Sequence, residues 1–353
     1  ADLGVMISAS HNPMPDNGIK FFAKGGDKLA DSVEAQIEAR LGEPWARPVG
    51  LNVGRVIEDT QAKNRYISYL LSTIKCNLAG LNVVVDCANG AASYSAPIVY
   101  EKAGASVTAI SATPTGWNIN ENCGSTHLDN LIKKVASEKA DLGVAHDGDA
   151  DRCLLVAANG DVIDGDHILN ILANQWLSQG KLNKNTVVGT VMSNLGFIKS
   201  MESSGIIVEK TAVGDRYVLE KMLEHNFNLG GEQSGHVIMR DFSNTGDGLL
   251  TALQIMQVMV TSQKTLSELA SNMNKFPQVL INIKDIQKEK LGSSQIIRDA
   301  IKASEQELAG IGRVLVRASG TESIVRVMVE ANELQLAEKI ADSLAQLVRL
   351  ELK

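Results

Sequence analysis

The chain has 353 residues, 44% of them hydrophobic and 21% charged, and its formal net charge is −7 at pH 7. A chain of this length holds roughly two to four domains, and its composition excludes a long disordered region. The acidic balance disfavours nucleic acid and anionic membranes as partners, so local Arg and Lys side chains must attract any anionic substrate.

The four cysteines lie far apart and include no C-x-x-C pair: Cys76, Cys87, Cys123 and Cys153. This spacing is typical of free thiols in a reducing cytoplasm, which is where we expect the protein. The most apolar stretch, residues 249–260, contains two glutamines and is shorter than the ~20 residues that cross a bilayer. The chain opens at Ala1 directly into a strand-like run, which suggests a fragment of a longer chain.

Strands are expected at residues 3–7 and 19–22, the first of them buried, with helices over 31–41 and 60–74 to follow. From there apolar strand-like runs and helical patterns alternate. The runs lie at 81–86, 107–110, 142–145, 154–156, 186–191 and 206–208, and the helices at 95–103, 128–138, 166–178, 196–203, from 217, and 247–260. The alternation predicts mostly parallel α/β sheets with functional loops at the carboxyl ends of strands.

The last part of the chain follows a different order, with a strand at 279–283, a helix at 294–308 and strands at 313–317 and 324–330. The terminal helix has one apolar face, formed by Ala337, Ile340, Ala341, Leu344, Leu347 and Val348. We therefore expect three consecutive α/β domains, the first incomplete, followed by a smaller α+β C-terminal domain. The boundaries are placed at residues 1–64, 65–164, 165–275 and 276–353.

Residues 147–152 read Asp-Gly-Asp-Ala-Asp-Arg after a buried apolar run, so they lie on a loop that leaves a strand. Asp147, Asp149 and Asp151 alternate with small residues, which lets the backbone curl until the three carboxylates converge. Like charges so close favour a bound cation, and oxygen ligands suit Mg²⁺. A solvated acidic turn is the alternative interpretation.

The residue types around these aspartates narrow the kind of metal site. A calcium EF-hand is excluded, because Arg152 stands where that loop needs glycine and Ala158 stands where it needs glutamate. Arg152 cannot bind a metal, but it can hold a phosphate beside one.

Residues 8–13 read Ser-Ala-Ser-His-Asn-Pro at the end of the first expected strand. A Ser-rich loop at a strand end can carry a nucleophile, with His11 and Lys20 as nearby proton carriers. An ordinary turn explains the same residues at least as well, because Ser, Asn and Pro are common in turns.

Two further loops carry polar groups that suit a phosphorylated sugar. In residues 230–236, side chains of Glu, Ser and His stand between glycines, which suits hydrogen bonds to sugar hydroxyls; a hairpin turn is the alternative. The loop at 318–323 lies between Arg317 and Arg326, and two guanidinium groups with two hydroxyls and a glycine amide form a phosphate cradle. A hairpin with incidental charges explains this loop equally well.

Taken together and in this order, the four loops resemble those of the α-phosphohexomutases. Residues 8–13 are similar to the phosphoserine loop with Ser10 in the phosphorylated position, residues 147–152 to the magnesium loop, residues 231–236 to the sugar-binding loop, and residues 317–326 to the phosphate-binding loop. The family has a further N-terminal portion of its first domain that is absent here, and Ser323 stands where the family often has proline.

Three shorter features resemble the glucosamine branch of this family more than the phosphoglucomutase or phosphomannomutase branches. They are Gln233, residues 213–217 and residues 118–127. The resemblance implies an isomerase that interconverts glucosamine 6-phosphate and glucosamine 1-phosphate, towards UDP-N-acetylglucosamine and cell-wall precursors. The route it implies passes through a phosphoserine enzyme and a glucosamine 1,6-bisphosphate intermediate.

The resemblance also implies a role for each site residue. Mg²⁺ is assigned to Asp147, Asp149, Asp151 and an oxygen of phosphorylated Ser10. His11 and Lys20 are the candidates for moving the hydroxyl proton, with Arg152 as a further catalytic residue. The substrate-binding residues are Glu232, Ser234, His236, Arg216, Arg317, Ser319, Gly320, Thr321 and Arg326.

The expected partner is a phosphorylated amino sugar, without nucleic acid or membrane, and the resemblance admits a homodimer. One alternative is an enzyme of the phosphoglucomutase or phosphomannomutase branch. The other is a non-catalytic phosphosugar-binding fragment, which the intact Ser10 and the three aspartates disfavour.

Overall fold

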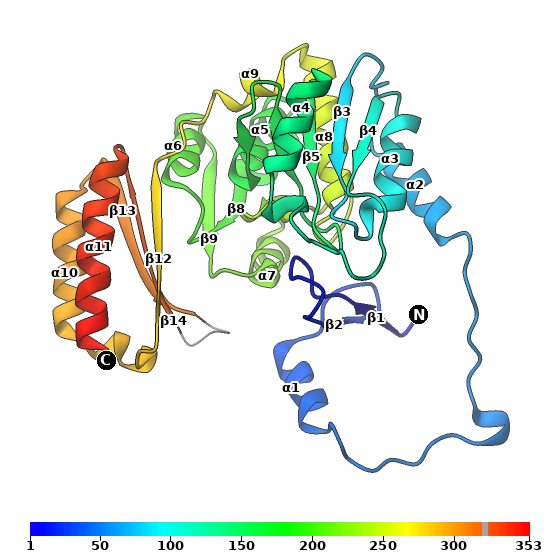
Figure 1. Cartoon of the computed structure of the whole chain (residues 1–353), viewed down its shortest axis with the longest axis horizontal. Helices are drawn as coiled ribbons and strands as arrows, with labels where there is room; N and C mark the ends of the chain where they lie inside the picture. The colour runs from blue at the N-terminus through cyan, green and yellow to red at the C-terminus, as the bar shows by residue number, and fades with distance from the viewer. Residues whose placement is uncertain (320–323) are drawn as a thin grey trace. The chain divides into compact units, whose positions relative to one another are not determined.

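The computed structural model describes residues 1–319 and 324–353, with the backbone alone at Asp31. The chain divides into two compact units (Figure 1). The first contains Ala1–Met192 and Gly205–Asn272, and the second contains Ser193–Ser204 and Met273–Lys353. The four domain boundaries expected from the sequence stay a prediction.

The first unit begins with an antiparallel hairpin of β1 (Leu3–Ile7) and β2 (Ile19–Ala23). The prediction that the first strand is buried is wrong: Leu3 is 51% exposed, Val5 57% and Ile7 74%. The reason is that the hairpin forms a sheet of only two strands, and no described element covers this face.

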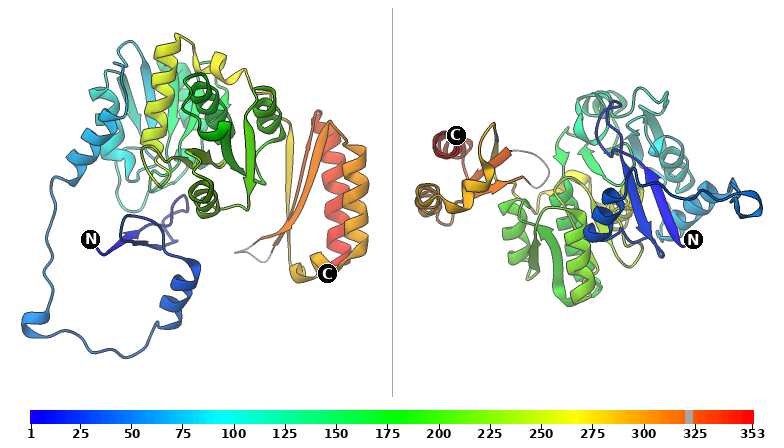
Figure 2. Two further views of the ribbon diagram at one scale, coloured as in Figure 1. Left: turned by 180° about the vertical axis from the view of Figure 1, so that it is seen from behind. Right: turned by 90° about the horizontal axis from the view of Figure 1, so that it is seen from below.

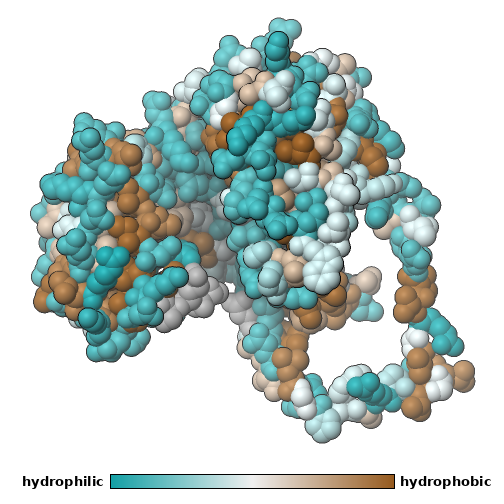
Figure 3. Space-filling view, in the orientation of Figure 1, coloured by the Kyte–Doolittle hydropathy of each residue, from teal (hydrophilic) through white to brown (hydrophobic). Residues whose placement is uncertain are grey.

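Helix α1 (Asp31–Ala39) and a stretch of chain with one short turn, η1 (Gly50–Asn52), follow the hairpin. Large apolar side chains are exposed along residues 41–57 and give this stretch brown patches in Figure 3; they are Leu41, Trp45, Val49, Leu51, Val53, Val56 and Ile57.

The first large sheet has the strand order β4-β3-β5-β6-β7. Its elements are α2 (Ala62–Ser72), β3 (Asn82–Asp86), α3 (Ala92–Lys102), β4 (Ser106–Ile110), η2 (Gly124–Thr126), α4 (Asp129–Glu138), β5 (Leu142–Ala145), β6 (Leu154–Ala157) and β7 (Val162–Ile163). Strand β3 is parallel to β4 and β5, whereas β5, β6 and β7 are antiparallel. The expected parallel sheet therefore ends at β5, because the chain turns back through the acidic loop into β6.

Helices cover both faces of this sheet, which explains why β5 is a continuous apolar run. Helix α4 packs through Leu131 and Val135 on Val84 and Val156, and Figures 1 and 2 show α8 on the opposite side. The acidic loop leaves β5 at the same edge of the sheet as the loop that follows β3. That edge is where side chains from several loops can meet.

The second large sheet has the order β11-β10-β8-β9, with β8 parallel to β9 and β10 and only β11 antiparallel. Its elements are α5 (Gly165–Ser178), η3 (Asn183–Asn185), β8 (Thr186–Thr190), β9 (Ile207–Thr211), α7 (Asp215–His225), β10 (Leu229–Gly231), β11 (Val237–Met239), α8 (Gly248–Ser262) and α9 (Leu266–Ala270). Helix α7 packs through Val218 and Met222 on Val188 and Ile238. It begins at Asp215, before the expected start at Tyr217, so Asp215 and Arg216 occupy its first turn.

The second unit is an antiparallel sheet, β12-β14-β13, with helices packed on its apolar face. Its elements are α6 (Leu195–Ser203), β12 (Gln278–Lys284), η4 (Lys288–Ser293), α10 (Gln295–Glu307), β13 (Gly312–Ala318), β14 (Ile324–Ala331) and α11 (Leu334–Glu351). The predicted apolar face of the terminal helix is confirmed, except that Leu347 is only half-buried. Helix α6 joins this unit because the backbone N–H of Leu195 donates to Glu330, a buried carboxylate that also pairs with Arg313.

Among the described residues, no helix has both the length and the apolar character needed to cross a membrane.

Candidate active site

The three aspartates of the acidic loop converge as predicted. One carboxylate oxygen from each of Asp147, Asp149 and Asp151 lies within 4.8 Å of the others. The curl comes from Ala150, whose φ of 63° is left-handed, and from Gly148, where an added Cβ would lie 2.4 Å from the carbonyl oxygen of Ser10. Close packing thus requires glycine at position 148, whereas the left-handed backbone at Ala150 is uncommon for an alanine.

Burial and mutual repulsion act on the charge of these carboxyl groups. Burial, with the charges of Asp151 and Asp149, raises the pKa of Asp147 to about 6. Burial also acts to raise the pKa of Asp151, but the hydrogen bond from His236, together with the positive charges of His236, Lys20 and Arg152, lowers that pKa below its usual range. The loop therefore concentrates negative charge that calls for a positive partner.

The donor set fits a hard cation such as Mg²⁺. Asp149 Oδ1 and Asp151 Oδ1 are buried and have no hydrogen-bond partner among the described residues. Such orphaned carboxylate oxygens are costly unless a cation or a donor satisfies them. Lys20 already brings one positive charge, with its Nζ 2.6 Å from Asp149 Oδ2 and 3.5 Å from Asp151 Oδ2.

Ser10 lies directly against the acidic loop. Its Oγ donates to Asp147 Oδ2 at 2.9 Å, and His11 Nδ1 lies 3.4 Å from the same Oγ. Ser10 is partly exposed and has a left-handed φ of 54°, which is unusual for a serine. A cavity of about 510 Å³ opens beside it, lined by both the serine loop and the acidic loop.

The two proton-carrier candidates occupy different places. Burial lowers the pKa of His11, and the nearby charge of Arg152 lowers it further. Burial alone would lower the pKa of Lys20, but the hydrogen bond to Asp149 and the negative charges of the three aspartates together raise it. His11 is therefore the neutral group next to the Ser10 hydroxyl, and Lys20, on β2, is the charged group that pairs with the acidic loop.

Residues 118–127 were noted in the sequence only for their resemblance to the glucosamine branch, and the structure gives one of them a role in holding the serine loop in place. Asn120 Nδ2 donates to the carbonyl oxygens of Ser10 and Asn12, both at 2.9 Å. Asn120 is 5% exposed and has a left-handed φ of 56°, for which asparagine is well suited. A second serine helps, because Ser8 Oγ accepts from the Ser10 amide and donates to Asp149 at 2.7 Å.

Arg152 stays at the acidic loop, as expected. Its backbone N–H donates to Asp147 Oδ1 at 3.2 Å, and its guanidinium Nε lies 3.8 Å from Asp147 Oδ2.

The predicted sugar loop, between β10 and β11, is a tight hairpin docked on the acidic loop. The backbone N–H of Cys153 donates to the carbonyl of Gly235, which has a left-handed φ of 92°. Glu232 is half-buried, and its Oε1 accepts from the backbone N–H of Gly214 at 3.0 Å. Ser234 Oγ is buried without a hydrogen-bond partner among the described residues, so it can bond a ligand hydroxyl.

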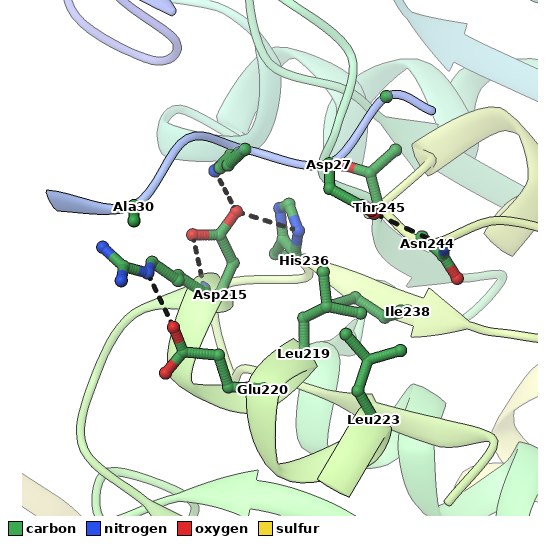
Figure 4. Close-up of a pocket in the computed structure, with 13 residues that line it drawn as sticks. Asp27, Ala30, Asp215, Leu219, Glu220, Leu223, His236, Ile238, Asn244 and Thr245 are labelled. Atoms are coloured by element: carbon green, nitrogen blue, oxygen red, sulfur yellow. Dashed lines mark hydrogen bonds and ion pairs between the residues drawn. The ribbon is translucent and has the colours of Figure 1, made fainter. Parts of the chain in front are cut away.

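Two other predicted substrate ligands face protein groups. His236 is 4% exposed, and its ring lies between Asp151 Oδ2 at 3.4 Å and Asp215 Oδ2 at 3.5 Å. Arg216 Nε donates to Glu220 Oε1 at 2.8 Å (Figure 4). Their roles as substrate ligands stay a prediction, while His236 clearly supports the Asp151 carboxylate.

The predicted phosphate cradle belongs to the second unit. Arg317 and Arg326 are opposite each other in the ladder of β13 and β14, so their side chains share one face. Burial and the charge of Arg326 lower the pKa of Arg317, and Arg317 Nε is buried without a partner among the described residues. Ser319 follows on this loop and is 5% exposed, whereas Gly320 and Thr321 lie outside the described residues.

Comparison with known proteins identifies the family. Profiles of the phosphoglucomutase/phosphomannomutase family match in four consecutive stretches: alpha/beta/alpha domain I at residues 1–45, domain II at 64–160, domain III at 164–276 and the C-terminal domain at 280–347. The phosphoglucosamine mutase of Paenarthrobacter aurescens (strain TC1) is 53% identical over 349 residues, 99% of this chain and 77% of that protein. The chain belongs to the phosphohexomutase family.

Other phosphohexomutases agree in sequence and in fold. The phosphoglucosamine mutase of Thermobifida fusca (strain YX) is 53% identical over 352 residues, 100% of this chain and 78% of that protein. A phosphoglucomutase/phosphomannomutase family protein of Burkholderia thailandensis has a TM-score of 0.80 at 22% identity. The match covers 100% of this chain and 78% of that protein. The N-acetylphosphoglucosamine mutase of Aspergillus fumigatus, solved with GlcNAc-6P and magnesium, has a TM-score of 0.79 at 17% identity. The match covers 99% of this chain and 89% of that protein. At these identities the two structures speak for the fold alone.

Proposed function

We propose that the protein interconverts glucosamine 6-phosphate and glucosamine 1-phosphate, as an isomerase that transfers a phosphoryl group through Ser10. The similarity to phosphoglucosamine mutases over nearly the whole chain supports the substrate. The observation that carries the reaction is the Ser10 hydroxyl bonded to Asp147 at 2.9 Å, at the tip of a loop seated on three converging carboxylates.

The reaction divides into two transfers at one serine. Phosphorylated Ser10 gives its phosphoryl group to the free hydroxyl of the sugar monophosphate, which forms glucosamine 1,6-bisphosphate. After the sugar has turned around, its other phosphoryl group returns to Ser10. Each transfer depends on alignment and on charge neutralisation more than on covalent chemistry by the protein.

The residues around Ser10 supply both requirements. Asn120 and Ser8 fix the loop, and His11 lies next to the Oγ that must lose or regain a phosphoryl group. Lys20 and Arg152 bring positive charge to the same place. Mg²⁺ held by Asp147, Asp149 and Asp151 would neutralise negative charge on the transferred phosphoryl group.

Binding of the rest of the sugar phosphate is assigned to the other two loops. Glu232 and Ser234 suit the ring hydroxyls, because they place a carboxylate and a hydroxyl without a partner among the described residues on one hairpin. Arg317 and Arg326 suit the phosphate that is not being transferred. Since the sugar binds in two orientations, this cradle must recognise phosphate rather than one face of the ring.

Two measurements test the proposal. Intact mass should show one added phosphate after incubation with glucosamine 1,6-bisphosphate, and Ser10→Ala should remove it. Assays with glucosamine, glucose and mannose 6-phosphates should show the highest kcat/KM for the amino sugar. A preference for glucose or mannose phosphate would instead place the protein in another branch of the family, and absence of both phosphate and turnover would indicate a phosphosugar-binding protein.

A further inference from the structure

A cavity of about 190 Å³ adjoins the sugar loop and is not used by the reaction outlined above. Its floor is apolar and comes from Leu219, Leu223 and Ile238, as Figure 4 shows. Its polar lining includes Asp215, in the first turn of α7, and Lys28, which also lines a neighbouring cavity bounded by Asp149 and Asp151. The two cavities therefore meet at Lys28, next to the acidic loop.

The Asp215 carboxylate already holds a primary ammonium group. Lys28 Nζ forms an ion pair with Asp215 Oδ2, and the Asp215 side chain is 23% exposed. The carboxylate is also oriented by the protein, because Oδ1 accepts from the Arg216 amide at 2.9 Å and His236 lies 3.5 Å from Oδ2. A carboxylate held in this way on a partly buried surface binds a cation more strongly than one in open solvent.

Asp215 stands next to the residue that we assign to the sugar hydroxyls. The backbone N–H of Gly214, the preceding residue, donates to Glu232 Oε1 at 3.0 Å. Asp215 directly follows the residue that binds Glu232, and its carboxylate lies 3.5 Å from His236 of the sugar loop. A sugar ring bonded to Glu232 is therefore held next to the segment that carries Asp215. In glucosamine phosphates, the 2-amino group is itself a primary ammonium at neutral pH, the same chemical group as the lysine end that occupies Asp215.

We propose that Asp215 binds the 2-ammonium group of the amino-sugar phosphate and that Lys28 is the internal cation that this group replaces. Asp215 is then the residue that distinguishes glucosamine phosphate from glucose phosphate, which presents a neutral hydroxyl at that position. This assignment rests on the proposed function, because it names the part of the substrate that the same site reads.

Binding affinity tests the assignment without relying on turnover. Calorimetry would give the Kd of glucosamine 6-phosphate and of glucose 6-phosphate for the wild type, Asp215→Asn and Glu224→Gln. The wild type should prefer the amino sugar by about tenfold or more, as for a charge-assisted hydrogen bond. Asp215→Asn should bring the ratio close to one while glucose 6-phosphate keeps its affinity. Glu224→Gln makes the same chemical change in an exposed part of α7 and should keep the wild-type ratio.

A second variant makes the test independent of how Asp215→Asn folds. Lys28→Met removes the internal cation, so the amino-sugar preference should rise above that of the wild type. An Asp215→Asn protein with the wild-type ratio, an equal loss for both sugars, or a Lys28→Met protein with an unchanged or smaller ratio would each overturn the assignment. A wild type with an Asp215-dependent preference but no mutase turnover would uphold it and refute the proposed reaction.

Discussion

The serine centre of the first unit and the arginine pair of the second unit gather charge in opposite ways. Ser10 and Asp147 are 137 residues apart in sequence and meet because two loops are packed together. Arg317 and Arg326 meet because β13 and β14 are neighbours in one ladder. The first arrangement depends on several side-chain bonds between loops, whereas the second needs only the register of a hairpin.

Both regions nevertheless bring like charges together, and they do so with opposite sign. One oxygen from each of the three carboxylates lies within 4.8 Å of the others, and burial together with the charge of Arg326 lowers the pKa of Arg317. Like charges held close by the fold are relieved by a ligand of the other sign. The contrast agrees with the proposed function, in which the acidic loop holds a metal cation and the arginine pair holds a phosphate.

The largest expected effect is at the serine itself. In the proposed function Ser10 accepts the phosphoryl group, so Ser10→Ala should lower turnover about a thousandfold or more and abolish phosphate incorporation. Intact mass and a coupled mutase assay would measure this. Ser8→Ala is the matched control, because it loses two hydrogen bonds but keeps Ser10. Loss of phosphate in Ser8→Ala but not in Ser10→Ala would move the nucleophile to Ser8.

The next largest effect should be a loss of Mg²⁺ affinity when the acidic loop is changed. Asp149→Asn removes one charge from the acidic loop, so Mg²⁺ affinity should fall about 10–100-fold, measured by calorimetry. The fold should remain, because less repulsion between carboxylates offsets the lost contacts. Asp161→Asn, in the exposed turn before β7, should leave Mg²⁺ affinity unchanged. Equal affinity in wild type and Asp149→Asn would remove this residue from the metal site.

The arginine pair should affect binding and leave the serine intact. Arg317→Lys replaces a planar fork by a single ammonium, so KM for the sugar phosphate should rise about tenfold while Ser10 still takes up phosphate. Arg349→Lys, on the exposed side of α11, is the control and should keep the wild-type KM. An unchanged KM in Arg317→Lys would argue against the cradle.

The support of the serine loop should have a smaller effect, confined to kcat. Asn120→Gly removes both bonds to the loop carbonyls, and glycine accepts the left-handed backbone at this position. We expect kcat to fall about tenfold with little change in thermal stability, because a small displacement of the nucleophile slows transfer. Asn122→Gly changes a left-handed asparagine that is exposed and should leave kcat unchanged. A loss of stability without a loss of kcat would show that Asn120 serves folding alone.

The last prediction concerns stability rather than turnover, and it involves the buried His146 beneath the acidic loop. Arg152 O can only accept, so His146 Nδ1 donates to it at 3.0 Å, and Nε2 accepts from Tyr100 at 2.9 Å. Burial lowers the pKa of His146 to about 4, whereas an unfolded histidine has a pKa near 6.5. The unfolded chain therefore binds the proton first, and stability should fall by about 2–3 kcal/mol as pH drops from 6.5 to 4.

Comparing variants separates this contribution from those of other groups. His146→Gln has no titrating ring, so its denaturation midpoint should fall less than that of the wild type between pH 7 and pH 5. Parallel curves for the two proteins would show that His146 does not govern stability in this range.

Local patterns were enough to predict much of the architecture. Alternating strand and helix patterns predicted the α/β sheets, and the apolar spacing of the last helix predicted its buried face, because periodicity reflects which side of an element meets the core. The acidic loop was predictable for the same reason, since its aspartates alternate with residues small enough to curl. The order of the four loops was sufficient to indicate the family.

Contacts between distant segments followed only from the tertiary structure. The turn back at β6, the exposure of β1, the clamp from Asn120 and the ion pair of Lys28 with Asp215 have no local pattern in sequence. The Asn120 clamp and the Lys28–Asp215 pair depend on which loops the sheets bring to one edge, and each joins residues more than a hundred positions apart. The sequence thus determined the types of elements and the chemistry of their loops, whereas packing decided which polar groups meet, because a hydrogen bond depends on position in space and not on separation along the chain.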